Sequence, residues 1–312
     1  MKTISSRSYC DQSDYEHMLE LLIEARLRTS DWHYAHVGEL AFNYFMAAIH
    51  LKLEDHIRLW YDQEKLVGFA LLGEDPAIDW QILPDYEWSG IEEEVMAWAE
   101  ERLEQLRKRD PQKWGEELVS GSRQDNNKRI EFLEKHGFTY RGDFSEVNML
   151  RSLTNPIPAP KLPDGFMVRE FLGLDEVAER AAIQHDVWQP WSVGDVFREQ
   201  YEWFMKIPPY RHDLDIVTVT PDGVIAAYVN GWIDPVNKIG DIGPVGAQEK
   251  YRRQGLTRAA LLECLQRMKI LGMDRACIST GFTNIPAREL YQSIGFTIVN
   301  HYLDYSKPNS EQ

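Results

Sequence analysis

Apolar residues recur at helical spacing in two long segments of the chain and alternate with polar residues in several short ones. Helical spacing is clearest at 91–106 and around Leu261, Leu262, Leu265 and Met268, and shorter helices are expected at 15–27, 128–134, 175–184 and 195–205. Alternating and β-branched runs predict strands at 56–60, 66–72, 166–170, 215–220, 224–232, 239–247 and 276–280. Helices and strands mixed in this way are typical of an α/β fold in a layered α+β arrangement.

A short basic loop follows the strand at 239–247 and enters the next helix. Four cations crowd a window in which Glu249 is the only acid: Lys250, Arg252, Arg253 and Arg258. A loop entering a helix points unpaired N–H groups and the positive end of the helix dipole at its ligand, and Gly255 lets the backbone approach closely. The segment therefore predicts a polyanion site. Neither G-x-x-x-x-G-K-S/T nor G-x-G-x-x-G is present.

A second motif follows the strand at 276–280. It consists of Asn284, Ala287, Leu290, Tyr291, Gly295 and Phe296, in the pattern N-x-x-A-x-x-L-Y-x-x-x-G-F. With the loop before it, this order resembles the GNAT superfamily of acyl-CoA-dependent N-acyltransferases, whose pyrophosphate loop reads Q/R-x-x-G-x-G/A. Here the loop reads Arg252-x-x-Gly255-x-Thr257, so Thr257 departs from the small residue of the family.

The resemblance implies a GNAT fold, with a mixed, mostly antiparallel central sheet flanked by helices, and acetyl-CoA (coenzyme A) as ligand. The residues that would contact the cofactor are Val245, Ala247, Arg252, Arg253, Gln254, Gly255, Leu256, Thr257 and Asn284. Asn284 also suits the N-cap of a helix before Pro286, and the two roles are compatible.

Catalytic candidates follow from the same motifs. An amine is mostly protonated at neutral pH, so a carboxylate is needed to receive its proton, and Asp241 is the only acid between Asp234 and Glu249. Asp241 is a candidate general base, or else a structural carboxylate at a strand edge. In the family a backbone N–H on this strand, opened by a bulge, stabilises the oxyanion. Tyr291 matches the family's general acid, the alternative being a packed aromatic ring.

The resemblance also implies that the helices before the second strand of the second half, with the loop between them, line the groove for the acceptor. Asp186 could fix an ammonium group, and Trp188 and Trp191 could cover a ring or cation, or simply pack under a long loop. His33 and His36 could ligate a metal, but no convincing third ligand lies nearby, so no metal is expected. They could instead form an inter-domain contact or part of the acceptor wall.

The first half of the chain repeats the pattern of the second. The loop at Gly90 corresponds to Gly255 and the Asn126 motif to Asn284, while proline-rich residues 153–164 form a linker between domains 1–152 and 165–312. Where the second loop has Arg252, the first has Glu87 and then three consecutive glutamates at 92–94. We therefore expect a degenerate first copy that does not bind the cofactor. The order of parts resembles tandem bacterial acetyltransferases of the mycothiol-synthase kind.

Charge and composition narrow the function classes. The net charge is −16, with 18 Lys and Arg against 30 Asp and Glu in residues 1–152, and 16 against 20 in residues 153–312. Such a chain repels nucleic acid and anionic membranes and attracts cations, although the charge also serves solubility. No signal peptide or apolar run near 18 residues is seen, so a cytoplasmic protein is expected. The protein is expected to be a monomer or a homodimer. Three cysteines predict no disulfide framework.

These features together predict an acetyl-CoA-dependent N-acetyltransferase. The acceptor would be a primary amine of a small molecule, possibly a cationic one, and transfer would be direct within a ternary complex. Two alternatives remain open: a protein acetyltransferase acting on lysine or N-terminal amines, and a non-catalytic acyl-CoA-binding regulatory protein.

Overall fold

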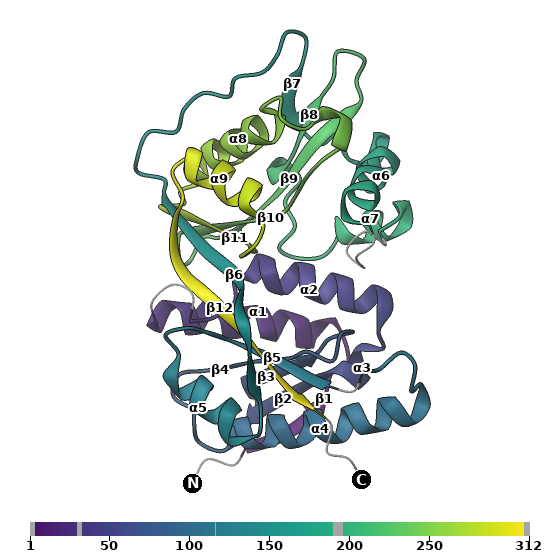
Figure 1. Ribbon diagram of the computed structural model, residues 1–312, viewed down its shortest axis with the longest axis vertical. Coiled ribbons are helices and arrows are strands. Elements are labelled where there is room, and N and C mark those ends of the chain that lie inside the picture. Colours follow the sequence, from purple (N-terminus) through teal and green to yellow (C-terminus); the bar gives the residue numbers. More distant parts are fainter. Residues whose placement is uncertain (1–3, 30–32, 116, 190–195, 309–312) are drawn as a thin grey trace.

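The computed structural model describes residues 4–29, 33–115, 117–189 and 196–308, and Figure 1 shows them as two stacked lobes. The first half of the chain forms β1 (Ile4–Ser8), α1 (Gln12–Arg28), α2 (Val37–His50), α3 (Leu53–His56), β2 (Ile57–Asp62), β3 (Lys65–Leu72), β4 (Ile78–Ile82), α4 (Ile91–Arg109), β5 (Glu117–Arg123), α5 (Asn127–Lys135) and β6 (Thr139–Ser152). Strands β1 to β4 form an antiparallel sheet in that order.

The second half carries the remaining elements. They are β7 (Met167–Glu170), η1 (Gly173–Asp175), α6 (Val177–Trp188), α7 (Arg198–Phe204), η3 (His212–Leu214), β8 (Asp215–Val219), β9 (Ile225–Asp234), β10 (Ile239–Ala247), η4 (Glu249–Tyr251), α8 (Leu256–Ile270), β11 (Arg275–Gly281), α9 (Ile285–Ser293) and β12 (Thr297–Pro308). Among the described residues, the second sheet has the order β5-β12-β6-β11-β10-β9-β8-β7, in which β10 and β11 are the parallel neighbours.

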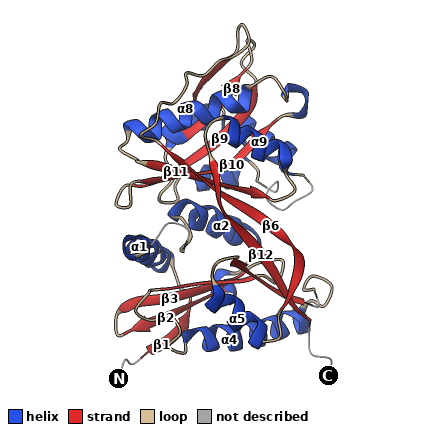
Figure 2. Ribbon diagram, turned by 60° about the vertical axis from the view of Figure 1, so that its left-hand side comes forward, coloured by secondary structure: helices blue, strands red, loops and turns tan. Residues whose placement is uncertain are grey.

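The two halves exchange strands. Strand β6 of the first half lies between β11 and β12 of the second, and β12 in turn lies between β5 and β6 of the first. Figure 2 shows β6 and β12 running together from one lobe to the other. Each half therefore completes its sheet with a strand from the other, and the lobes share one continuous sheet.

Helix α2 lies at the junction of the halves and packs on β9. Successive side chains of a strand point to opposite faces, and the position of Gly231 faces Cys264 and Met268 of α8, so Trp232 points to the face that α2 covers. A Cβ on Gly38 would lie 2.2 Å from Cγ of Trp232, which means that only glycine permits this approach of helix and sheet.

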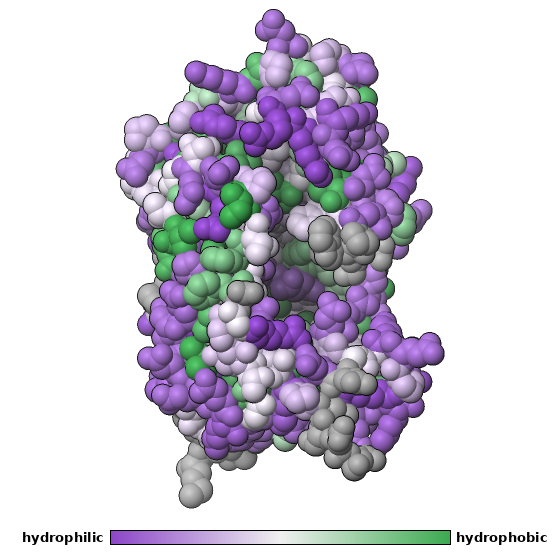
Figure 3. Space-filling model, in the orientation of Figure 1, coloured by the Kyte–Doolittle hydropathy of each residue, from purple (hydrophilic) through white to green (hydrophobic). Residues whose placement is uncertain are grey.

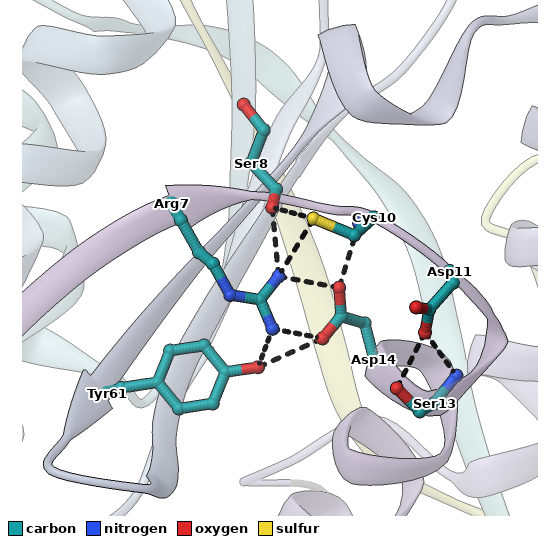
Figure 4. A network of polar contacts seen from close by, with 7 residues as sticks. All are labelled: Arg7, Ser8, Cys10, Asp11, Ser13, Asp14 and Tyr61. Atoms are coloured by element: carbon teal, nitrogen blue, oxygen red, sulfur yellow. Dashed lines mark hydrogen bonds and ion pairs between the residues drawn. The ribbon is translucent and has the colours of Figure 1, made fainter.

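A polar cluster ties α1 to the first sheet (Figure 4). The guanidinium of Arg7 on β1 donates to both carboxylate oxygens of Asp14 on α1, and Tyr61 on β2 donates to the same carboxylate at 3.0 Å. The Asp11 side chain caps α1 by accepting from the N–H of Ser13. These contacts orient α1, whose far end carries Arg26 to the junction between the halves.

The expected α/β class with mixed, mostly antiparallel sheets is confirmed. Strand β10 has the expected bounds, and the other expected elements appear with shifts of a few residues, α7 beginning later than the predicted 195. Cys264 is buried within α8, as helix packing requires. The sequence patterns did not predict β1, α2, α3, β4, β5, β6 or β12. Within the described ranges, no helix is both long and apolar enough to span a membrane.

The backbone supports the internal repeat. Trp88 and Gly90 of the first loop have φ of 57° and 112°, and their counterparts Arg253 and Gly255 have 66° and 81°. Asn126 and Asn284 are both helix N-caps whose side chains accept from an N–H three residues later. Residues 153–164 contain neither helix nor strand. The domain bounds 1–152 and 165–312 remain a prediction, because strands cross them.

Candidate active site

The basic loop meets the helix α8 in a form suited to anions. Gly255 is the N-cap with left-handed φ, and it supplies no side-chain cap to the first turn, which contains Leu256, Thr257 and Arg258. The Leu256 side chain is buried and its carbonyl accepts from the Thr218 hydroxyl at 3.1 Å, so Leu256 can offer a ligand only its N–H. The loop side chains Arg252, Arg253 and Gln254 are exposed beside it.

A hollow of about 460 Å³ lies next to this loop. Its lining includes Lys250, Arg252, Gln248 and Asp186. The guanidinium of Arg252 donates from Nε to the carbonyl of Ala247 at 3.3 Å, which anchors the base of the side chain and leaves its end near the hollow. The residues present therefore fit a diphosphate: uncapped N–H groups, a glycine at close approach and two cations.

Strands β10 and β11 separate just before the loop. They pair only from Ile239 to Ile242, and beyond that point β10 keeps its pairing with β9, with a register shift between Ile242 and Val245. The bulge expected near Gly243 is thus present at this shift. Along the described chain, residues 245–247 have no strand partner on the β11 side.

The free edge of β10 carries two aligned donors. The N–H of Gln248 donates to Ala226 on β9 at 3.0 Å. Because successive N–H groups of a strand point to opposite edges, those of Val245 and Ala247 point away from β9, into the gap that β11 leaves. Two parallel N–H groups at an open edge can bind carbonyl oxygens of an extended ligand.

The corresponding loop of the first half is filled by its own carboxylate. Glu92, 2% exposed, accepts from the N–H of Trp88 at 2.6 Å, and Glu87 accepts from the Tyr34 hydroxyl. Burial raises the pKa of Glu92. A carboxylate inside the loop takes the place that a phosphate would need and repels one.

A cavity of about 290 Å³ lies between the halves, below the gap between β10 and β11. Its lining comes from α1, α2 and β6 of the first half and from α6, β10 and β11 of the second: Arg26, His36, Gly38, Glu39, Phe42, Asn43, Glu146, Trp188, Asp241, Ile242, Gly243, Pro244, Cys277 and Ser279. Figure 3 shows a hollow near the middle of this face, at the level of α2 in Figure 1.

Asp241 lies in the wall of this cavity with its side chain 16% exposed. The Cys277 thiol donates to its Oδ1 at 3.4 Å, and Nδ1 of His36 is 3.9 Å from its Oδ2. Burial raises the pKa of Asp241 from 3.8 to about 6. A carboxylate with this pKa is mostly ionised at pH 7 and still basic enough to accept a proton.

His36 is neutral and structural. Its Nδ1 accepts from the N–H of Gly38, so Nε2 carries the proton and faces the carbonyl of Ile239 at 3.3 Å. Burial lowers the pKa of His36 to about 3. His36 therefore forms an inter-half contact beside the cavity, one of the roles expected for it, while His33 lies against Arg123. Among the described residues, no three His, Cys, Asp or Glu side chains are grouped to hold a metal ion.

Two further carboxylates line the cavity and were not anticipated. Glu39 comes from α2 and Glu146 from β6, and both residues line the cavity although they are exposed overall. The cavity is open to solvent on one side (Figure 3), so the protein around it removes only part of the hydration of a carboxylate there. Burial and then the charge of Asp241 raise the pKa of Glu39, and burial raises that of Glu146. The nearest signal in the sequence was His36, which was expected at an inter-domain contact or in the acceptor wall and lies three residues before Glu39.

Tyr291 and Asn284 lie on and before α9. Tyr291 is 5% exposed in the core of the second lobe, and burial raises the pKa of its hydroxyl, which keeps the phenol protonated at neutral pH. Asn284 caps α9, accepting from Ala287 and donating to the Thr280 hydroxyl at 3.2 Å. Its cap role is therefore present, and its contact with a cofactor remains a prediction.

The three residues that were expected to bind the acceptor do not lie together at one site. Trp188 lines the cavity with Asp241 and donates from Nε1 to the hydroxyl of Tyr228 at 2.7 Å. Asp186 is exposed and lies instead in the hollow beside the basic loop. Trp191 lies outside the described residues.

Comparison with known proteins places this site in a family. Residues 180–296 match the model of the Acetyltransferase (GNAT) family. A mycothiol acetyltransferase from Thermobispora bispora is 34% identical over 157 residues, 48% of this chain and 52% of that protein, so the chain spans about half the length of this relative. A tandem GNAT protein from the clavulanic acid biosynthesis pathway superposes with a TM-score of 0.67 at 12% identity, over 99% of this chain and 100% of its own. A GCN5-related N-acetyltransferase from Sphaerobacter thermophilus gives 0.64 at 19%, over 99% and 98%.

The chain thus has a tandem GNAT arrangement, with one GNAT fold in each half. The second half contains the open basic loop and the residues that match the GNAT acetyltransferase family. The expected likeness to mycothiol-synthase-like tandem proteins is confirmed.

Proposed function

We propose that this protein transfers an acetyl group from acetyl-CoA to a primary amine of a small molecule, within a ternary complex. One observation carries the proposal: Asp241 lines a cavity at the point where β10 leaves β11 and runs on to the uncapped helix α8. An acyl donor held along the edge of β10 and an amine in the cavity would meet beside this carboxylate.

The donor would be held by the backbone and basic groups described above. The N–H groups of Val245 and Ala247 suit its extended arm, and the loop at Arg252, Arg253 and Gly255 suits its diphosphate. Acetyl-CoA supplies an activated acetyl thioester when bound. The same strand edge offers donors to an acyl oxygen on which negative charge accumulates.

The proton transfers fall to two side chains. Asp241 accepts the proton that the amine nitrogen loses as it bonds to the acetyl carbon, and its raised pKa makes it a competent base near neutral pH. Tyr291 donates a proton to the sulfur as its bond to that carbon breaks, since its phenol is neutral. Neither step needs a covalent enzyme intermediate.

The size of the cavity favours a small acceptor. About 290 Å³ is at the lower end of ligand pockets, which run from roughly 300 to 1,000 Å³. The likeness to mycothiol acetyltransferase also supports a small-molecule amine. Intact proteins are included in the test below because a single lysine side chain is also narrow.

The test measures thiol release from acetyl-CoA across small amines and intact proteins, and coenzyme A binding by calorimetry. We expect turnover with free amines, and at least tenfold weaker coenzyme A binding in Arg252→Glu. Lys128→Glu, the same charge reversal at an exposed site of the first half, serves as control. Unchanged coenzyme A affinity in Arg252→Glu would overturn the loop assignment, and binding without any turnover would identify a non-catalytic protein.

A further inference from the structure

The cavity that holds Asp241 is lined by three carboxylates and by far fewer cations. Glu39 and Glu146 face Asp241 from the first half of the chain, and Arg26 is the one arginine or lysine in the lining. Arg26 is 8% exposed, and its Nη1 donates to the carbonyl of Tyr34 rather than to a carboxylate. The cavity therefore has more carboxyl groups than cations, and because the pKa of Glu39 is raised to about 8, a cation that binds there would draw Glu39 into its charged form.

Neither Glu39 nor Glu146 forms an ion pair with another of the described residues, and both line the cavity together with Asp241. Burial and neighbouring carboxylates oppose their charges, as the raised pKa of each shows. A cation bound in the cavity would relieve that repulsion.

The three carboxylates are spread around the cavity instead of converging on one point. They do not form a group that could hold a metal ion in the described structure. Glu39 lies on α2, Glu146 on β6 and Asp241 on β10, three separate walls of a 290 Å³ space. Separated charges in a cavity of this volume match an organic cation with its charges also separated.

Building on the proposed function, we propose that the acceptor carries a second cationic group, and that Glu39 and Glu146 bind it while Asp241 faces the amine that is acetylated. The substrate class is a small diamine or polyamine, including amino sugars with two ammonium groups. Glu39 is then the specificity-determining residue. The first half, which has no open loop for a cofactor, contributes the part of the site that selects the acceptor.

The position of Glu39 suits this role. It lies in the first turn of α2, and Asn43 follows one turn later on the same face and also lines the cavity. Gly38 packs directly on Trp232, so the start of the helix is held against the second half. A carboxylate on a fixed helix can discriminate between one and two charges, because a hydrogen-bonded ion pair in a partly desolvated site is stronger than one in water.

The experiment compares matched acceptors in wild type and Glu39→Gln. Linear diamines of three to six carbons and the monoamines of equal length are acetylated at pH 7.5, and kcat/KM is obtained from thiol release. We expect wild type to prefer diamines by about tenfold or more, and Glu39→Gln to lose about tenfold on diamines only. Glu20→Gln removes an equal charge from the exposed face of α1 and should change neither.

Separate outcomes distinguish the two proposals. Equal use of monoamines and diamines, or an equal loss on both in Glu39→Gln, would overturn the dication while leaving acetyl transfer in place. If no amine is acetylated, the proposed function fails. The dication site is then tested by calorimetry of 1,4-diaminobutane with wild type and Glu39→Gln in the presence of coenzyme A. Binding that depends on Glu39 supports a dication site, and no binding overturns it.

Discussion

Replacing Asp241 by Asn is expected to lower activity and raise stability together. The amide keeps the shape of the side chain but accepts no proton, so the amine loses its base. General bases contribute about 10² to 10⁴ in rate, and kcat for Asp241→Asn should fall within that range. The same change removes a charge that the fold holds at a cost.

The stability gain follows from the pKa of the carboxyl group. Its folded-state pKa is about 6, against 3.8 for an ordinary Asp. Between these values the folded chain binds the proton more tightly than the unfolded chain, so stability falls as pH rises through this window. Above it, the ionised group costs up to about 3 kcal/mol. Since the side chain is 16% exposed, we expect Asp241→Asn to gain about 1 to 3 kcal/mol at pH 7.5 and little at pH 4.

The pH profile supplies the second measurement. At pH 5 about a tenth of the Asp241 carboxyl groups are ionised, and at pH 7 about nine tenths, so kcat/KM per unprotonated amine should fall about tenfold between them. This acidic limb should vanish in Asp241→Asn. Thermal melts at pH 4 and 7.5, with thiol release from pH 5 to 8.5, test both effects.

Asp274→Asn, at an exposed position before β11, is the matched control and should alter neither property. The reasoning fails if Asp241→Asn retains the acidic limb, or if its stability falls at pH 7.5. A structural carboxylate would show loss of stability with activity reduced in proportion to the unfolded fraction.

Two further predictions concern packing and proton donation. Gly38→Ala should destabilise the protein by about 1 to 3 kcal/mol and raise the KM for the acceptor, because its Cβ would lie 2.2 Å from Trp232, which donates to the carbonyl of Gly243 at the bulge. Denaturant unfolding and acceptor kinetics measure this, and Gly115→Ala, with open space around it, is the control; equal stability of the two variants would contradict the packing argument. Tyr291→Phe should lower kcat by about 10² without changing coenzyme A affinity, since it removes only the hydroxyl. Tyr140→Phe removes a hydroxyl from an exposed tyrosine and serves as the control. If Tyr291→Phe and Tyr140→Phe gave the same rate in single-turnover assays, Tyr291 would have only a packing role.

The parts of the site that the sequence revealed are local ones. The basic loop, the N-cap Asn284 and the strand at 239–247 each depend on a few neighbouring residues. Their patterns can therefore be recognised in the sequence alone. The N–H groups alternate between the two edges of β10, as in any strand, and the bulge lies between Ile242 and Val245. These features predicted the anion site and placed Asp241 beside it.

What the sequence did not reveal arises between the halves. Helix α2 is more apolar on average than α1, α4 and α8, and it packs against β9 of the second half, a contact that its own residues do not reveal. Glu39 and Glu146 meet Asp241 only after the strands have crossed, and no spacing in the chain encodes that meeting. Asp186 was assigned to the acceptor because of its neighbours in sequence, whereas the structure turns it toward the basic loop.

The exchange of β6 and β12 also governs the order in which the protein can be made. Strand β12 ends at Pro308, and its pairing with β5 joins residues 117–123 to residues 302–308. During translation, the first lobe emerges long before β12, which pairs with both β5 and β6. The edges of β5 and β6 that face β12 are therefore unpaired during that time. Those edges can pair only after residues 297–308 have been synthesised.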